Sequence, residues 1–204
     1  METGLKFGPL GEDAAHLCVD MQKLFAPGSP WGAPWVARRL PAVTMLASAR
    51  PERSFFTRFI PPRSLTGAPG SWGRYYAAWP EILRETMSEE WLRLLPELEA
   101  LAPAGHVFDK SVYSPWWQTG LEATLRAKGV TTLVVSGSET DICVLATVLG
   151  AVDRGFRVIV AVDAVCSSSD ETHDAVLSLF GGRMGRQIET ATTGQILEDW
   201  RVPP

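Results

Sequence analysis

Histidine and cysteine are scarce in this sequence, and their scarcity limits the available chemistry. The 204 residues contain three histidines and three cysteines. Three irregularly spaced cysteines form neither a disulfide framework nor a CxxC metal motif, so each is expected to be a free thiol in a reducing compartment. No histidine lies between His16 and His106. A reactive thiol here therefore needs a base other than the usual histidine.

Long apolar runs and an excess of basic residues are also missing. The apolar runs are strand-sized, which excludes the roughly 20-residue stretch of a membrane-spanning helix. The formal net charge of -4 offers no basic field to nucleic acid or anionic lipid. The start, METGLKFGPLGEDAAH, lacks the features of a secretory signal. We expect a soluble, cytoplasmic protein with no nucleic-acid or membrane partner.

The length and a hydrophobic share of 46% fit one globular domain over residues 1–204. Strand-like and helix-like segments alternate along the chain, which predicts an α/β fold: a three-layer α/β/α arrangement with a mostly parallel sheet. Residues 61–80 are rich in Pro, Gly and aromatics and show no clear period. Strands are expected at 15–19, 53–60, 105–110, 130–136, 158–162 and an edge near 187–193, and helices at 34–49, 119–128, 140–155 and 170–180. Residues 88–100 are expected to form a short helix and its approach to the next strand.

Three polar side chains fall at the carboxyl ends of expected strands, namely Asp20, Lys110 and Cys143. Because open parallel sheets bind ligands at that edge, we expect the three to lie close together. Thr140 is the expected N-cap of the following helix, which places Cys143 in its first turn. The positive end of the helix dipole and a nearby Lys110 ammonium are expected to stabilise a thiolate there.

A cysteine nucleophile also needs a proton acceptor. None of the histidines falls at this edge of the sheet, and His173 is expected to be a structural residue near a helix start. Asp20 is the better candidate, provided that partial burial raises its pKa, because it can take the thiol proton and deliver it to a leaving amine. Backbone N–H groups before Cys143 can face an oxyanion, so acyl transfer from a C–N or C–O bond is the expected reaction class.

Each of these residues also has a plain structural interpretation. Cys143 can be a small buried apolar residue of the core. Asp20 can be a cap at the end of a strand, and Lys110 can be a surface charge that pairs with Asp109. The aromatic group at 72–79 fits a pocket wall and a subunit contact equally well. Only the coincidence of the three polar residues at one edge favours a site. Cys18 and Cys166 are expected to be core residues.

Four stretches match one family in order and spacing. They are Val19-Asp20-Met21-Gln22 with Phe25, Asp109-Lys110 followed by Tyr113-Ser114, the stretch GSETDICV at 137–144, and VDAVCS at 162–167 followed by His173. The sequence thereby resembles the isochorismatase-like cysteine hydrolases. That superfamily includes nicotinamidases, isochorismatase itself, and the N-carbamoylsarcosine, ureidoacrylate and biuret amidohydrolases.

The resemblance implies a catalytic triad of Asp20, Lys110 and Cys143. Cys143 would attack a small amide or ureido carbonyl to form a thioester, while Asp20 moves protons and Lys110 supports the thiolate. It also implies a cis peptide bond at Ser138–Glu139 and an oxyanion hole made by the backbone N–H groups of Glu139 and Cys143. Water and a small-molecule amide are the implied partners, together with further copies of the chain in a homo-oligomer, as a dimer or tetramer.

Two departures from the family pattern narrow the expectation. Nicotinamidases bind a metal through an Asp-x-His motif, where this chain has Thr57-Arg58-Phe59, so no metal or other cofactor is expected. Isochorismatase proper lacks the cysteine nucleophile. The metal-free amidohydrolase branch remains. The alternatives are a nicotinamidase-like or isochorismatase-like activity, or a noncatalytic protein that uses residues 72–79 as a partner surface.

Substrate-binding residues are predicted less directly. Arg58 is expected either to anchor a substrate carboxylate or to form a structural ion pair. The other residues expected to line the pocket are Phe25, Trp79, Tyr113 and Trp116. A nucleotide-binding Rossmann domain is disfavoured, because no Gly-rich phosphate turn follows Asp20.

Overall fold

A six-stranded sheet forms the centre of the computed structural model, which describes residues 3–200. The strand order is β3-β2-β1-β4-β5-β6, and every adjacent pair is parallel. The predicted α/β class is confirmed, and the sheet is entirely rather than mostly parallel. The strands are β1 (Ala14–Val19), β2 (Ser54–Phe59), β3 (Val107–Lys110), β4 (Thr132–Ser138), β5 (Arg157–Cys166) and β6 (Ile188–Ala191).

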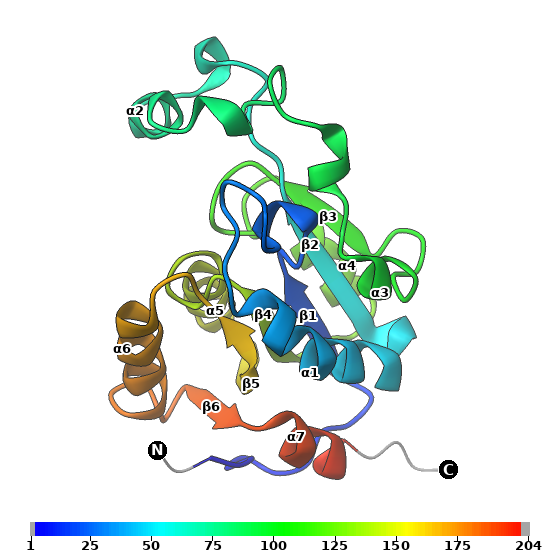
Figure 1. Ribbon diagram of the computed structural model, residues 1–204. Coiled ribbons are helices and arrows are strands. Elements are labelled where there is room, and N and C mark those ends of the chain that lie inside the picture. Colours follow the sequence, from blue (N-terminus) through cyan, green and yellow to red (C-terminus); the bar gives the residue numbers. More distant parts are fainter. Residues whose placement is uncertain (1–2, 201–204) are drawn as a thin grey trace.

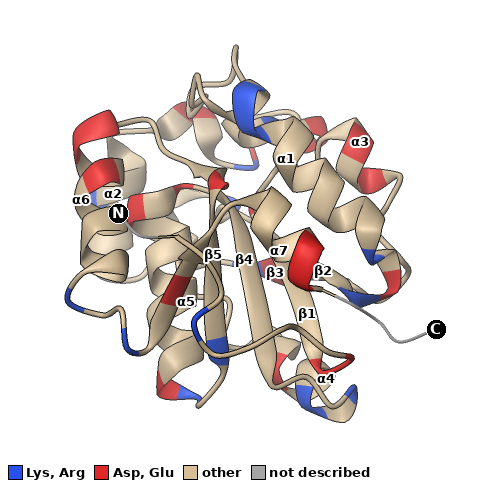
Figure 2. Cartoon of the chain, turned by 90° about the horizontal axis from the view of Figure 1, so that it is seen from below, with Lys and Arg blue, Asp and Glu red and all other residues tan. Residues whose placement is uncertain are grey.

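Helices cover both faces of this sheet (Figures 1 and 2). One face carries α1 (Val36–Ala49), α3 (Pro96–Glu99) and α7 (Thr193–Asp199), and the other carries α4 (Leu121–Ala127), α5 (Leu145–Asp153) and α6 (Asp170–Gly181). Successive side chains of a strand point to opposite faces of the sheet. Cys18 therefore packs in the core beneath α1, α3 and α7, and Leu17 packs in the core beneath α4, α5 and α6. Within the described residues, no helix is long and apolar enough to cross a membrane.

The strand order changes direction between β1 and β4, and this reversal positions the site. The chain runs outward from β1 to β2 and β3, then returns to β4 on the other side of β1. Loops that leave β1 and β4 therefore diverge and open a crevice at the carboxyl ends of the strands. In Figure 1 the segment between β2 and β3, with α2 (Ser71–Ala77), stands beyond these same strand ends. Short 3-10 turns complete the connections at Lys23–Phe25, Pro51–Arg53, Leu65–Gly67, Pro80–Ile82 and Glu89–Leu92.

Two expected boundaries were wrong. The chain after β4 first forms a π-helical turn, Thr140–Val144, whose preceding residue is Glu139, so Thr140 is not the N-cap. The Thr140 hydroxyl instead lies 2.8 Å from Nδ1 of His173, which has the structural role expected of it. The strand expected to end at Val162 continues to Cys166, because Val165 and Cys166 pair with Gly137 and Ser138 of β4 after a shift in register. The Asp163 carboxylate accepts hydrogen bonds from the backbone and hydroxyl of Thr193 at 2.7 and 2.9 Å.

Candidate active site

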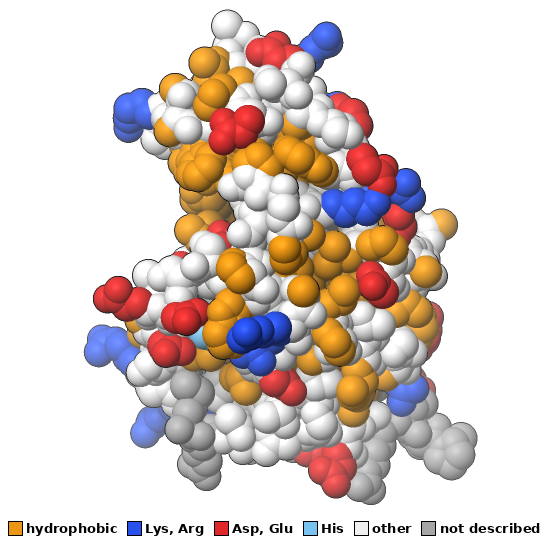
Figure 3. Space-filling model, viewed as in Figure 1, with side chains coloured by type: hydrophobic (Ala, Val, Ile, Leu, Met, Phe, Trp, Pro, Cys, Tyr) orange, Lys and Arg blue, Asp and Glu red, His pale blue; other side chains and the backbone are white. Residues whose placement is uncertain are grey.

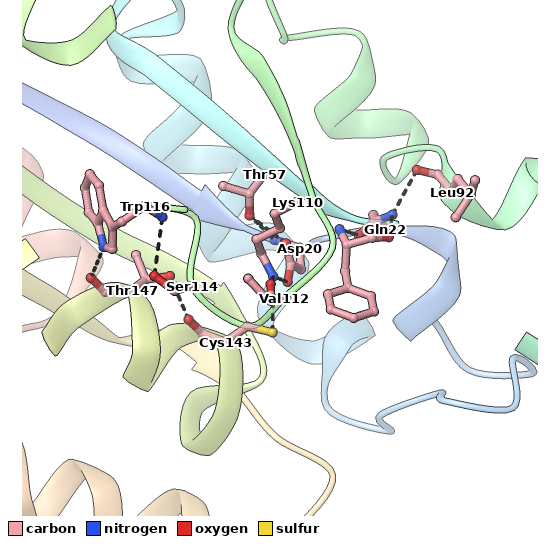
Figure 4. Close-up of polar contacts among 11 residues, drawn as sticks. Asp20, Gln22, Thr57, Leu92, Lys110, Val112, Ser114, Trp116, Cys143 and Thr147 are labelled. Atoms are coloured by element: carbon pink, nitrogen blue, oxygen red, sulfur yellow. Dashed lines mark hydrogen bonds and ion pairs between the residues drawn. The ribbon is translucent and has the colours of Figure 1, made fainter. Parts of the chain in front are cut away.

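Asp20, Lys110 and Cys143 lie in contact at the carboxyl edge of the sheet (Figure 4). Asp20 directly follows β1, Lys110 ends β3, and Cys143 lies in the π-helical turn after β4. Lys110 Nζ lies 2.6 Å from Asp20 Oδ2 and 3.3 Å from Cys143 Sγ. The Asp20 and Lys110 side chains are 0% exposed, and Cys143 is 5% exposed. Lys110 is therefore not the surface partner of Asp109.

Thr57, a β2 residue that the sequence did not single out, holds Asp20 in place. Its hydroxyl donates a hydrogen bond to Asp20 Oδ1 at 2.6 Å, and its carbonyl accepts one from the Asp20 N–H at 3.2 Å. The Asp20 backbone has φ 49, in the left-handed region that Asp tolerates better than most residues. One carboxylate oxygen is thus directed to Thr57 and the other to Lys110.

The chain reaches Cys143 through a closely packed bend at the end of β4. Gly137 has φ +115, and a Cβ atom there would lie 2.0 Å from the carbonyl oxygen of Val19, so a side chain does not fit. The next peptide bond, Ser138–Glu139, is cis, at the position that the family resemblance implies. The Glu139 carbonyl then accepts a hydrogen bond from the N–H of Val144 at 3.0 Å, which closes the π turn around Cys143.

The buried ion pair decides the protonation states. Burial disfavours the Lys110 ammonium, but the Asp20 carboxylate, with the Cys143 sulfur beside it, outweighs that cost and raises the pKa of Lys110. Burial also raises the pKa of Cys143, opposed by the Lys110 charge and reinforced by the Asp20 charge. Because Asp20 and Lys110 together are neutral, an ionised Cys143 would add an uncompensated charge to a dry site. Burial therefore favours the thiol form of Cys143, whereas the sequence predicted a readily formed thiolate.

A pocket of about 230 Å³ reaches Cys143 from the surface. Three of the residues expected to line it do so: Phe25, Trp79 and Tyr113. Figure 3 shows hydrophobic side chains gathered at a hollow between the α2 segment and the body of the molecule. The remaining lining residues are Pro30, Trp31, Gly32, Phe59, Tyr75, Glu139, Ile142, Cys143 and Ser168. Of the aromatic residues that were not predicted singly, Tyr75 belongs to the group at 72–79, Trp31 lies in the segment after β1, and Phe59 ends β2.

Arg58 and Trp116 do not line this pocket, contrary to expectation. The half-buried Arg58 makes a bidentate ion pair with Asp109, at 2.7 and 2.9 Å, which was the alternative interpretation. Trp116 donates a hydrogen bond from Nε1 to the Thr147 carbonyl at 2.8 Å. Its ring fills the space left by Gly150, where a Cβ atom would lie 2.2 Å from the ring.

The histidines have structural partners away from the thiol. His16 Nε2 lies 2.7 Å from the Ser136 hydroxyl, and burial lowers the pKa of His16 to about 3. His106 Nδ1 lies 2.9 Å from the Ser54 carbonyl oxygen. Over residues 3–200, no group of three or more His, Cys, Asp or Glu side chains is arranged to hold a metal ion. Asp20 is the titratable group best placed to exchange a proton with Cys143.

The model of the isochorismatase domain matches residues 14–192 of this chain. This chain belongs to the isochorismatase family. The predicted family is therefore confirmed, and relatives within it include enzymes named for amide hydrolysis.

Two curated relatives cover most of this isochorismatase-family chain. Maleamate amidohydrolase of Pseudomonas putida is 32% identical over 189 residues, 87% of this chain and 85% of that protein. Ureidoacrylate amidohydrolase of Methylobacterium radiotolerans is 31% identical over 184 residues, 79% of this chain and 70% of that protein. The match to an uncharacterised isochorismatase family protein of Bacillus subtilis, 31% identical, spans 64% of that protein's length.

A solved structure supports the fold. The cysteine hydrolase from Pseudomonas syringae pv. phaseolicola aligns with a TM-score of 0.78 at 23% identity, over 98% of both chains. The isochorismatase-like architecture expected from the sequence is thereby confirmed.

Proposed function

We propose that this protein is a cysteine-dependent amidohydrolase that cleaves a C–N bond, other than a peptide bond, of a small amide, carbamoyl or ureido compound. One observation carries the proposal: at the base of the pocket, Lys110 Nζ contacts both Cys143 Sγ, at 3.3 Å, and Asp20 Oδ2, at 2.6 Å. The names of the maleamate and ureidoacrylate relatives support the reaction class.

Asp20 acts as the base in the first half of the reaction. It takes the Cys143 proton as Sγ bonds to the substrate carbonyl carbon, and the carbonyl electron pair moves to oxygen. The backbone N–H groups of Glu139 and Cys143 stabilise that oxyanion. When the intermediate collapses, the C–N bond breaks and Asp20 returns the proton to nitrogen. Ammonia or an amine leaves, and the acyl group remains on Cys143 as a thioester.

Water completes the cycle. Asp20 takes a proton from a water molecule as the water oxygen attacks the thioester carbon, and the C–S bond then breaks. The departing sulfur recovers a proton from Asp20, so the acid is released and the resting thiol returns. The net reaction is amide plus water to acid plus amine.

Lys110 makes the proton transfer feasible in a buried site. At rest its ammonium balances the Asp20 carboxylate, 2.6 Å away. After the proton moves to Asp20, the same ammonium balances the thiolate, 3.3 Å away. The net charge of the three residues is unchanged, so the nucleophile forms without burying an additional charge.

A substrate screen tests this proposal. Ammonia release would be measured for a panel of small amides, ureas and carbamoyl amino acids with the wild type, Cys143→Ser and the matched variant Cys166→Ser. We expect the wild type to hydrolyse one chemical group of the panel, Cys143→Ser to lose at least about 1000-fold in kcat, and Cys166→Ser to stay active. Equal activity of Cys143→Ser would contradict the assigned nucleophile, and an inactive wild type would favour the noncatalytic alternative.

A further inference from the structure

The charge of the pocket wall indicates which substrates fit. Among the described residues that line the pocket, none is Lys, Arg or His, and the charged side chain is Glu139. The nearby cation Lys110 already has its charge matched by Asp20 at 2.6 Å. A substrate carboxylate entering the pocket would lose its hydration without gaining a cationic partner, which is unfavourable.

Half of the residues that line the pocket are aromatic, and several of them gather around Trp31. Its ring centroid lies 6.1 Å from that of Phe25, 5.7 Å from that of Tyr75 and 6.5 Å from that of Trp79. Tyr75 and Trp79 are 37% and 36% exposed, so a ligand can reach them. The faces of such rings attract ammonium groups within about 6 Å, while they also accept apolar surface.

Acidic groups lie on the side of the pocket opposite the aromatic α2 segment. Glu139 Oε1 accepts a hydrogen bond from the N–H of Ser168 at 2.9 Å, and burial raises the pKa of Glu139. Just beyond Ser168, α6 begins with Asp170 and Glu171. Figure 3 shows acidic side chains over this helix, beside the hollow. A cation approaching the pocket is attracted at its edge and, once inside, favours the ionised form of Glu139.

We propose that the pocket selects small amides whose non-reacting end is a cationic apolar group, such as an alkylammonium, and rejects amides that end in a carboxylate. This inference rests on the proposed function and names its substrate class. It separates the chain from its two amidohydrolase relatives, since maleamate and ureidoacrylate are carboxylates by name.

The test compares ligands that differ in charge but not in shape. A trimethylammonium amide and the amide with a tert-butyl group in its place are isosteric, and succinamate supplies the carboxylate. Each would be titrated into the Cys143→Ala variant, with tryptophan fluorescence or calorimetry as the readout, for several spacer lengths. We expect the best cationic amide to bind about tenfold more tightly than its tert-butyl isostere. Succinamate should be the weakest ligand.

A second comparison assigns the preference to this wall. In the same background, Glu139→Gln should reduce the ratio of the two affinities about threefold or more. The matched change Glu52→Gln should leave the ratio unchanged, because the exposed Glu52 lies before β2, at the other end of the strands. Equal binding of the isosteric pair, tightest binding of succinamate, or no binding of any cationic amide at millimolar concentration would overturn the inference.

The outcomes for binding and for catalysis are separable. A cationic preference in Cys143→Ala without any hydrolysis by the wild type would support this inference and contradict the proposed function. Hydrolysis that depends on Cys143 but favours carboxylate substrates would support the proposed function and contradict this inference.

Discussion

Breaking the buried pair of Asp20 and Lys110 tests how closely the site is tied to the fold. Oδ2 and Nζ lie 2.6 Å apart, and both side chains are 0% exposed. At that distance the attraction is about 6 kcal/mol for an effective dielectric constant of about 20, against a desolvation cost of several kcal/mol per ion. Lys110→Met leaves the carboxylate buried and unpaired. We expect it to lower the free energy of unfolding by about 3–5 kcal/mol.

The design uses a double-mutant cycle in the Cys143→Ala background, so that no thiolate can replace Asp20 as the partner of Lys110. Adding Asp20→Asn to Lys110→Met removes both charges, and the double variant should lose at least about 2 kcal/mol less than the sum of the single variants. Stability would be measured by urea unfolding, with m unchanged.

The control is the neighbouring exposed pair. Arg58 Nε and Asp109 Oδ1 lie 2.7 Å apart, but these side chains are 29% and 50% exposed, so Asp109→Asn should cost less than about 1 kcal/mol. If Lys110→Met costs no more than Asp109→Asn, the reasoning about a buried pair is refuted.

Three further predictions follow from contacts around the site. Thr57→Val removes the hydroxyl that lies 2.6 Å from Asp20 Oδ1. It should lower the free energy of unfolding by about 2 kcal/mol, and it should change kcat, which it lowers, more than it changes KM. Unchanged values in urea unfolding and steady-state kinetics would contradict this. Asp20→Asn removes the negative charge that helps to raise the pKa of Cys143, so alkylation of Cys143 at neutral pH, followed by peptide mapping, should accelerate while hydrolysis is lost; slower alkylation would contradict it. Burial lowers the pKa of His16 from 6.5 to about 3, so between these pH values the ring is neutral in the folded protein and protonated in the unfolded one. The free energy of unfolding should therefore fall by about 1.4 kcal/mol per pH unit as the pH drops from 6.5 towards 3. NMR that detects a His16 titration near its ordinary pKa would contradict the last prediction.

The positions of the three polar residues could be predicted because they depend on few facts. The clear apolar periods of the strands identify an α/β fold, and the carboxyl ends of parallel strands share one edge. Asp20, Lys110 and Cys143 each fall at such an end, so their proximity needs no knowledge of loop paths. The family motifs then supply their roles as an implication.

The surroundings of these residues could not be predicted, because they depend on packing across the fold. Thr57 supports Asp20 only because β1 and β2 are adjacent and in a particular register. Trp31 and Tyr75 come from segments without a period. Trp116 turns away from the pocket because Gly150, far along the chain, leaves room for its ring.

The protonation state of Cys143 shows the same limit. Its place near the start of a helix is visible in the sequence and suggests a stabilised thiolate. Its burial, which dominates and raises the pKa, follows only from the three-dimensional packing. The base is consequently more important to the proposed mechanism than the sequence alone indicated.

Mass spectrometry of the acylated enzyme would identify the nucleophile. The wild type would be mixed with a hydrolysed amide, quenched with acid during turnover and digested, and the acyl mass located by fragmentation. We expect an acyl group on the peptide containing Cys143, absent from the Cys143→Ala variant. An acyl group on another residue, or full turnover by Cys143→Ala, would contradict it.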